Sequence, residues 1–238
     1  MKGTHLIAEA RAAGRAALDE PAGKRLLAEF GVAVPEALVV RDASEAGAAF
    51  GKLRAPLALK MISPDILHKS EARAVRLNVT SAEELAAACE EILGNARAYK
   101  KDARIDGLLV EEMAPPGQEV VIGGVGDPQF GPLVMVGLGG ILVEVLGDVS
   151  FRICPIARLD AEEMLDELKG AALLRGARGG KPVSRAAIVD ALLKIGGERG
   201  LLMTHAQNIA EADVNPLIVS ESGAVAVDAR FVLTQVKD

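Results

Sequence analysis

The sequence has few aromatic residues: five Phe, one Tyr and no Trp among 238 residues. Few flat rings are therefore available for stacking on the bases of a nucleic acid. Excess positive charge is also missing, since 27 Lys and Arg stand against 33 Asp and Glu and leave a formal net charge of −6. Nucleic acids and anionic membranes attract proteins that carry an excess of positive charge. We expect no nucleic acid and no membrane among the partners.

Cysteines and long apolar runs are scarce as well. Cys89 and Cys154 are the only two cysteines, which is too few for a disulfide framework or a thiolate metal site. The first twenty residues carry several charges instead of the apolar stretch of a secretion signal. The most apolar region, residues 131–147, is interrupted by glycines, Pro132 and Glu144. These features predict a cytoplasmic protein.

Hydrophobic residues make up 50% of the chain, which is enough to fill the core of one large or two small domains. Helices are expected at 5–18 and 22–30, and after the capping residues Asp42, Thr80, Asp160 and Ser184. Runs typical of strands occupy 36–40, 56–61, 74–79, 108–113, 119–123, 133–136, 151–154, 214–219 and 224–232. Because several of these runs follow one another directly, the pattern favours an α+β fold with largely antiparallel sheets. We expect two lobes, 1–107 and 108–238.

The C-terminal pair of strands allows a prediction from register alone. If residues 220–223 form the hairpin loop, Asn215 lies directly opposite Asp228. Side chains that face each other across two strands have Cβ atoms roughly 4.5 to 5.5 Å apart. An amide oxygen and a carboxylate at that spacing can share one Mg²⁺. A plain cross-strand Asn–Asp hydrogen bond would use the same spacing.

A second segment, 56–70, combines a short apolar strand with a loop. The strand carries Lys60, Pro64 ends it, and the loop presents His68. A lysine at a strand end can neutralise phosphate oxygens, and a neutral imidazole can act as a nucleophile toward phosphorus. Taken alone, the same residues also fit a solvent-directed lysine and an ordinary surface histidine.

Two further segments could contact a nucleotide. Gly137–Gly140 contains three glycines whose backbone N–H groups could turn toward an anion, although a tight hairpin explains them equally well. Glu111, Glu112 and Met113 end a strand just before Pro115, where main-chain groups could read an adenine edge and an acidic side chain could bind ribose. A solvated strand end is the alternative for these residues.

Taken together, several motifs in order resemble the ATP-grasp β subunit of NDP-forming acyl-CoA synthetases, the ADP-forming acetate–CoA ligase family related to succinyl-CoA synthetase. The resemblance spans about residues 20–233. The motifs that carry it are LALKMISPDILHKSEARAV, LLVEEMAPPGQEVVIGGVGDPQFGPLVMVGLGGILVEVLGD, FRICPI, EADVNPLIV and AVDAR. The resemblance implies an ATP-grasp fold, in which two α+β lobes hold the nucleotide between them.

The same resemblance implies a ligase that converts acid, CoA and ATP into acyl-CoA, ADP and phosphate through phosphohistidine. His68 would be catalytic and would carry the phosphoryl group to an α subunit that binds CoA and the acyl group, so a hetero-oligomer is implied. Asn215 and Asp228 would carry Mg²⁺. Residues that would contact ATP or ADP are Lys60, Glu111, Glu112, Met113, Glu119, Gly139 and Gly140.

One position departs from the family pattern. Arg73 stands where the family usually has glycine, in a stretch expected to approach the phosphates. An arginine there could add a contact to an anion, or its side chain could block the close backbone approach that glycine allows. Two alternatives therefore remain open: a degenerate module that binds nucleotide or senses acyl-CoA, and an ATP-grasp carboxylate–amine ligase that would not use His68.

Overall fold

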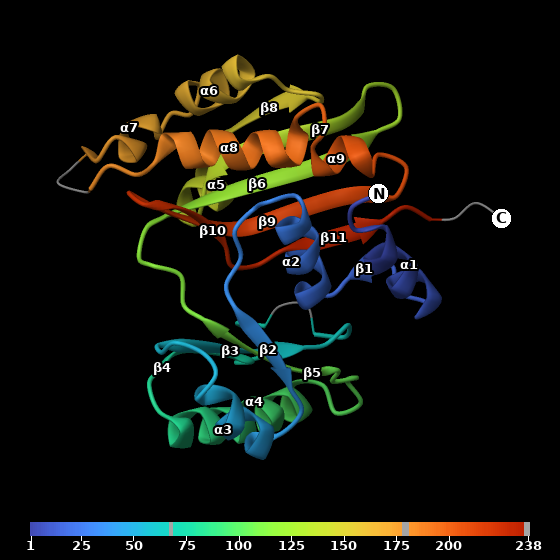
Figure 1. The fold of residues 1–238 in the computed structure, drawn as a ribbon, viewed down its shortest axis with the longest axis vertical. Coiled ribbons are helices and arrows are strands. Elements are labelled where there is room, and N and C mark those ends of the chain that lie inside the picture. Colours follow the sequence, from blue (N-terminus) through green and yellow to red (C-terminus); the bar gives the residue numbers. More distant parts are fainter. Residues whose placement is uncertain (67–68, 178–180, 236–238) are drawn as a thin grey trace. The chain divides into compact units, whose positions relative to one another are not determined.

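The computed structural model describes residues 1–66, 69–177 and 181–235 of the chain (Figure 1). The chain forms two compact units. The smaller unit comprises Pro35–Ala114, and the larger unit comprises Met1–Val34 together with Pro115–Asp238. Within the described ranges, no helix combines the length and the apolar character needed to cross a membrane.

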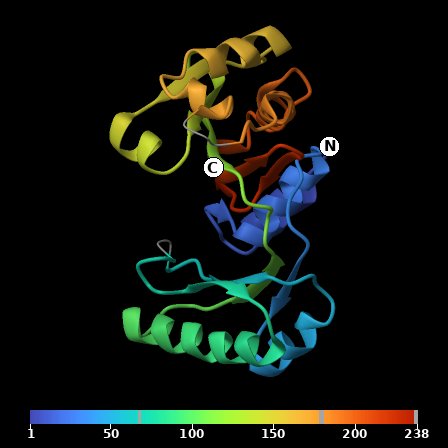
Figure 2. The ribbon, with the colours of Figure 1, turned by 90° about the vertical axis from the view of Figure 1, so that its left-hand side faces the viewer.

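The smaller unit is a four-stranded antiparallel sheet covered by two helices. The strand order is β2-β5-β3-β4, with β2 at Ala37–Val40, β3 at Leu57–Ile62, β4 at Val75–Val79 and β5 at Gly107–Glu112. The helices are α3 (Ala43–Phe50) and α4 (Ala82–Tyr99), and Figure 2 shows α4 lying along one face of the sheet. Leu59, Leu85 and Val110 belong to the core between sheet and helices. The central strands β3 and β5 carry Lys60 and Glu111.

The larger unit is built on a second antiparallel sheet, in the order β1-β11-β9-β6-β7-β8, with β10 paired to β9. Its strands are β1 (Ala17–Leu18), β6 (Gln118–Asp127), β7 (Gly131–Leu138), β8 (Val149–Ile153), β9 (Ile209–Ser220), β10 (Gly223–Ala226) and β11 (Arg230–Leu233). Its helices are α1 (Thr4–Ala12), α2 (Glu20–Glu29), α5 (Ile141–Leu146), α6 (Arg158–Asp166), α7 (Ala171–Leu174), α8 (Arg185–Gly196) and α9 (Leu201–Thr204).

Helices α6, α8 and α9 pack against β7 on one face of this sheet, and α8 lies over it, roughly along the strands (Figure 1). Along β9, buried Ala212 and Val214 alternate with exposed Asp213 and Asn215. The buried residues join the core under the helices, so the exposed ones lie on the opposite face. A strand alternates its side chains in this way because successive Cβ atoms point to opposite sides.

The two units differ from the expected division at residue 107. The first 34 residues belong to the larger unit, because Leu26 and Leu27 of α2 are fully buried in the same core as Phe231 of β11. Residue 107 is also the first residue of β5, which is an inner strand of the smaller sheet. The chain therefore begins in the larger unit, continues through the whole of the smaller unit and then returns to the larger one.

The expected helix caps are partly correct. Asp42 accepts the Glu45 N–H at 2.9 Å, and Ser184 accepts the Ala187 N–H at 3.2 Å, which confirms both caps. The prediction for Thr80 was wrong by one residue, because Ser81 caps α4 and Thr80 precedes it.

One further prediction of local structure was wrong, and one alternative that the sequence left open is excluded. Asp160 does not begin α6: it lies within the first turn and accepts the N–H of the N-cap residue Ala157 at 2.7 Å. The segment that follows Gly140 forms the short helix α5, so Gly137–Gly140 does not connect two strands as a tight hairpin.

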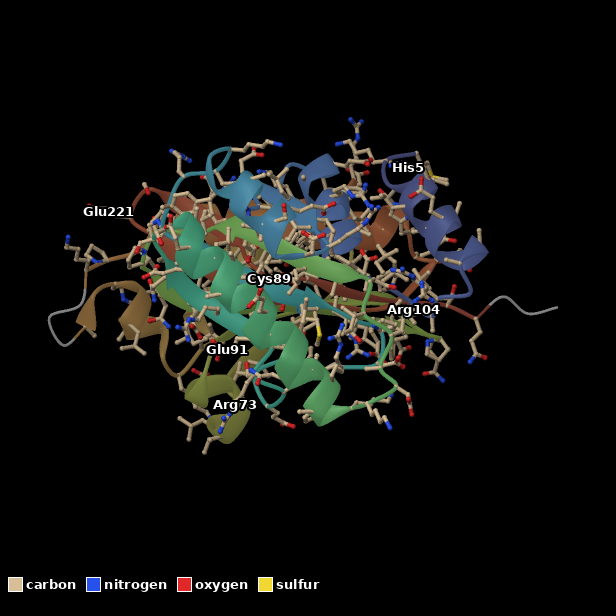
Figure 3. The ribbon with its side chains drawn as sticks, turned by 90° about the horizontal axis from the view of Figure 1, so that it is seen from below. His5, Arg73, Cys89, Glu91, Arg104 and Glu221 are labelled. Carbon is tan, nitrogen blue, oxygen red and sulfur yellow. The ribbon has the colours of Figure 1, made fainter. Side chains whose placement is uncertain are left out.

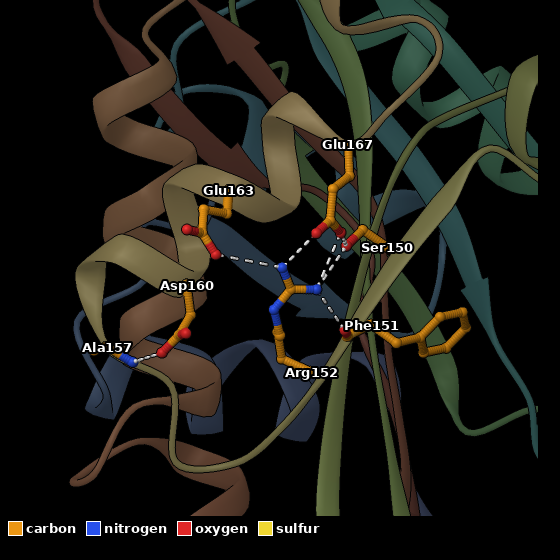
Figure 4. Close-up of polar contacts among 7 residues, drawn as sticks. All are labelled: Ser150, Phe151, Arg152, Ala157, Asp160, Glu163 and Glu167. Atoms are coloured by element: carbon orange, nitrogen blue, oxygen red, sulfur yellow. Dashed lines mark hydrogen bonds and ion pairs between the residues drawn. The ribbon is translucent and has the colours of Figure 1, made fainter.

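The edge strand β8 is fixed to α6 by the charged cluster drawn in Figure 4. Arg152 donates to both carboxylate oxygens of Glu167 and Ser150 donates to the same carboxylate. Glu163 lies 3.7 Å from the same guanidinium. Hydrogen bonds from Arg152 and Ser150 lower the pKa of Glu167 to about 2. The cluster stabilises the edge of the sheet on its helical side.

Candidate functional site

The C-terminal hairpin has the predicted register. Ser220 pairs with Gly223 and Leu217 pairs with Ala226, so the loop itself is the shorter turn Glu221-Ser222 rather than the whole of 220–223. Beyond β10 the same register continues, since the Asn215 N–H donates to the Asp228 carbonyl at 3.3 Å. The structure therefore places Asn215 and Asp228 opposite each other.

A second carboxylate, Asp213, lies beside this pair. It precedes Asn215 by two residues on β9, which puts both side chains on the exposed face, and its cross-strand partner is Arg230. Partial burial by surrounding protein and the charge of Asp228 raise the pKa of Asp213, and the Arg230 guanidinium opposes this shift. A raised pKa at a cluster of acidic side chains marks a place where a cation would relieve repulsion.

These oxygen atoms suit Mg²⁺. One amide and two carboxylates are hard ligands, and Mg²⁺ usually keeps several waters and takes other ligands from substrate phosphates. Within the described ranges no group of three or more His, Cys, Asp or Glu side chains could hold a metal. The described side chains at this place are one amide and two carboxylates, a small ligand set of the kind that Mg²⁺ completes with water and phosphate oxygens.

Glu119 and the two glycines of the predicted phosphate region lie together. The Gly139 N–H donates to the Glu119 carbonyl at 2.8 Å. A Cβ added to Gly139 would lie 2.7 Å from the Glu119 Cβ, and one added to Gly140 would lie 3.7 Å from its Oε2. Gly140 also has a φ of +65°. Glycine is needed here because the two segments approach too closely for a side chain at position 139.

In the smaller unit, Lys60 and Glu111 form a buried ion pair. The Lys60 Nζ lies 2.6 Å from Glu111 Oε1, and their side chains are only 10% and 2% exposed. The pair forms across the two central strands, where Lys60 is opposite Leu109 and Ala58 is opposite Glu111. Glu111 therefore orients the ammonium group at a defined place on the sheet.

The other residues expected at the adenosine site are engaged in local contacts. The Glu112 carboxylate binds the Arg54 guanidinium at 2.8 Å, and hydrogen bonds from Arg54 lower the pKa of Glu112. The Glu112 N–H donates to the Glu36 carbonyl, and the Met113 N–H donates to the Pro56 carbonyl. Because these two N–H groups already have acceptors, an adenine edge would have to bond to other main-chain groups of this segment.

His68 lies outside the described residues, but the turn that follows it is described. The Ala74 N–H donates to the Lys69 carbonyl at 2.8 Å and the Arg73 N–H to the Ser70 carbonyl at 3.1 Å. Arg73 has a φ of 49°, in the left-handed region that favours glycine. Arg73 is labelled in Figure 3, and the Asn95 side chain of α4 donates to the Arg73 carbonyl at 3.0 Å. The backbone at this departure from the family pattern is therefore one that glycine would adopt.

Asp213 was missed by sequence reasoning, although the signal was present. The register that pairs Asn215 with Asp228 also puts Asp213 on the same face, two residues away, and pairs it with Arg230. The Lys60–Glu111 pair could not be read from the sequence, because it depends on which strands are neighbours in the sheet.

Known proteins match this chain over nearly its whole length. A family model described as an ATP-grasp domain matches residues 9–233. The chain is 44% identical to a Pyrococcus furiosus protein named acetate–CoA ligase [ADP-forming] I subunit beta, over 98% of each chain. It is 46% identical to the corresponding subunit II of the same organism, over 98% of this chain and 99% of the relative.

Solved structures agree with these relatives. A chain of Ca. Korarchaeum cryptofilum acetyl-coenzyme A synthetase 1, in complex with coenzyme A and Ca-AMPCP, matches with a TM-score of 0.92 and 40% identity, over 97% of this chain and 99% of that chain. Another structure of that protein is described as holding coenzyme A and Mg-AMPPCP, with its phosphohistidine segment pointing towards the nucleotide binding site. The chain belongs to the ATP-grasp family, and within it to the β subunits of ADP-forming acyl-CoA synthetases.

Proposed function

We propose that this chain is the nucleotide-binding β subunit of an ADP-forming acyl-CoA synthetase and carries a phosphoryl group between nucleotide and an α subunit. The observation that carries the proposal is the similarity over 98% of both chains to a protein named as such a β subunit. The paired Asn215 and Asp228 on the open face of the larger sheet support it, because they are oxygen ligands of the kind that MgATP enzymes use.

In the proposed reaction, His68 is the nucleophile. The lone pair of its neutral imidazole attacks the γ-phosphorus of ATP, a P–N bond forms, and the bond to the bridging oxygen breaks so that ADP leaves with that electron pair. The reverse reaction returns the phosphoryl group to ADP. The chain's main task is to position the phosphates and to neutralise their charge.

Named side chains divide that task. Lys60, oriented by Glu111, would neutralise phosphate oxygens. Asn215 and Asp228 would hold Mg²⁺, with Asp213 beside them, and the bound ion would spread the negative charge of the phosphates. Gly140 would offer a backbone N–H to an anion next to Glu119, and Gly139, whose own N–H donates to the Glu119 carbonyl, would let the two segments approach closely. Glu111, Glu112 and Met113 would form the strand end that borders the adenosine.

An α subunit would supply the coenzyme A and acyl sites. The chain covers only 30% of the Archaeoglobus fulgidus acetate–CoA ligase [ADP-forming] I, to which it is 43% identical, so a relative exists in which this part belongs to a longer chain. We also propose a cytoplasmic location, in keeping with Cys89 and Cys154, which are both free and buried.

The test is to incubate the purified chain with MgATP, with and without a candidate α subunit, and to look for acid-labile phosphate on His68 by mass spectrometry. We expect phosphate on His68 in the wild type and none in His68→Ala. The matched control is His5→Ala, an exposed histidine on α1, which should leave the label unchanged. Nucleotide binding without label under both conditions would contradict the carrier role.

A further inference from the structure

Helix α2 contains a buried ion pair that the proposed reaction does not use. The Lys24 Nζ lies 2.7 Å from Glu20 Oε1, and both side chains are only 5% exposed. The other buried residues of this helix are Ala22, Gly23, Leu26 and Leu27, which carry no charge. Removing two charges from water commonly costs more than their attraction returns, so replacement by apolar residues is often neutral or stabilising. A buried ion pair of this kind is therefore weak evidence for a role in stability.

The ion pair lies on the face of α2 that packs against the segment carrying Asp228. A Cβ added to Gly23 would lie 2.9 Å from the Ala229 carbonyl oxygen and 3.3 Å from a ring carbon of Phe231. Residues 20, 23 and 24 share one side of a helix, since neighbours three and four apart lie close together. Figure 1 shows α2 beside β11, in agreement with these contacts.

Asp228 is directly linked to this contact. Its carboxylate Oδ1 accepts the N–H of Ala229 at 2.8 Å, and Ala229 is the residue on which Gly23 packs. The position of α2 therefore affects the backbone that fixes the Asp228 carboxylate.

We propose that Glu20 and Lys24 are positioning residues for the metal–nucleotide site and act through Asp228. This inference rests on the proposed function, since it concerns the same site. Residues that orient metal ligands without touching the metal typically change metal affinity by roughly 10–100-fold when they are replaced. Loss of the pair should therefore weaken Mg²⁺-dependent nucleotide binding while the fold persists.

The experiment replaces both charges at once, with Glu20→Leu and Lys24→Met in the full chain. This double variant removes the two opposite charges together, so that neither is left facing an apolar replacement of the other. Isothermal titration gives the Kd of ADP with and without Mg²⁺, and thermal unfolding gives the Tm. We expect an unchanged or raised Tm, a Kd for MgADP about tenfold or more higher, and a much smaller change without Mg²⁺.

The matched control is the ion pair of the same spacing on α8, where Lys194 lies 2.6 Å from Asp190 and the side chains are 34% and 55% exposed. Asp190→Leu with Lys194→Met should leave the Kd for MgADP unchanged. If the first double variant does not fold, the swap Glu20→Lys with Lys24→Glu keeps an ion pair and reverses its direction, and it should also weaken MgADP binding.

Three results separate the possibilities. If the wild type does not bind MgADP, the proposed function fails. If the wild type binds and either variant of α2 binds within about twofold of it, the pair is structural and this inference is overturned. To test whether the pair acts through Asp228, the α2 double variant is combined with Asp228→Asn. It should then cause little further loss of MgADP affinity, whereas full additivity of the two losses would show that Glu20 and Lys24 do not act through Asp228.

Discussion

Arg73 is held in a backbone conformation that arginine disfavours, and this gives a quantitative prediction. Its φ is 49°, where the Cβ of a residue other than glycine crowds the neighbouring carbonyl at a cost of roughly 1–2 kcal/mol. Glycine would remove that cost, but it would add conformational freedom to the unfolded chain worth about 0.4–1 kcal/mol. Taking the middle of each range, Arg73→Gly should stabilise the protein by about 0.5–1 kcal/mol.

The local contacts do not depend on the arginine side chain. The hydrogen bonds from the Arg73 N–H to Ser70 and from Asn95 to the Arg73 carbonyl use main-chain atoms of residue 73, so glycine retains them. The side chain itself is exposed. For a protein of this size, 1 kcal/mol corresponds to roughly 2–4 °C, so the expected gain in Tm is about 1–4 °C.

Thermal unfolding followed by circular dichroism measures this gain, with Arg73→Ala as the matched control. Alanine removes the charge and the long side chain but keeps the Cβ, so its Tm should stay near that of the wild type. A Tm for Arg73→Gly no higher than that for Arg73→Ala would refute the reasoning, because it would show that the left-handed backbone carries no strain at this residue.

Three other predictions can be tested in the same assays. Gly139→Ala should lower the Tm and weaken ADP binding, since its Cβ would lie 2.7 Å from the Glu119 Cβ; unchanged values would show that the two segments can separate. Glu167→Gln should lower the Tm at pH 7, and the difference should shrink as the pH falls from 4.5 toward about 2, because Arg152 holds the folded-state pKa below the ordinary value of 4.5. Burial lowers the pKa of His205 below 6.5, so stability should fall as the pH drops below that value, and His205→Gln should flatten this part of the Tm profile.

The hairpin that carries Asn215 and Asp228 was predictable because its register depends on local features. The apolar alternation along β9 and the turn at Glu221-Ser222 together fix which residues face each other. The same reasoning was less reliable at helix ends. Two adjacent residues, Thr80 and Ser81, can both cap α4, and the sequence pattern does not choose between them.

Features that depend on distant contacts were not accessible from the sequence. Helix α5 is rich in residues that favour strands. It begins just after Gly139, which lies close to Glu119 of another strand, and such a contact between distant segments is not encoded locally. Residues 1–34 join the larger unit because Leu26 of α2 shares a core with Phe231 near the other end of the chain. No local pattern encodes such a pairing of distant segments.

The backbone at Arg73 also bears on the choice between an active carrier and a degenerate nucleotide-binding module. If the turn expected to approach the phosphates were no longer needed, it could relax once arginine replaced glycine, and residue 73 would leave the left-handed region. The turn is retained, with its hydrogen bonds from Ala74 to Lys69 and from Arg73 to Ser70. This retention favours an active carrier. If Arg73→Gly raises the Tm without raising the yield of phosphate on His68, the arginine is tolerated by the reaction; a higher yield would show that its side chain restricts the approach of the nucleotide.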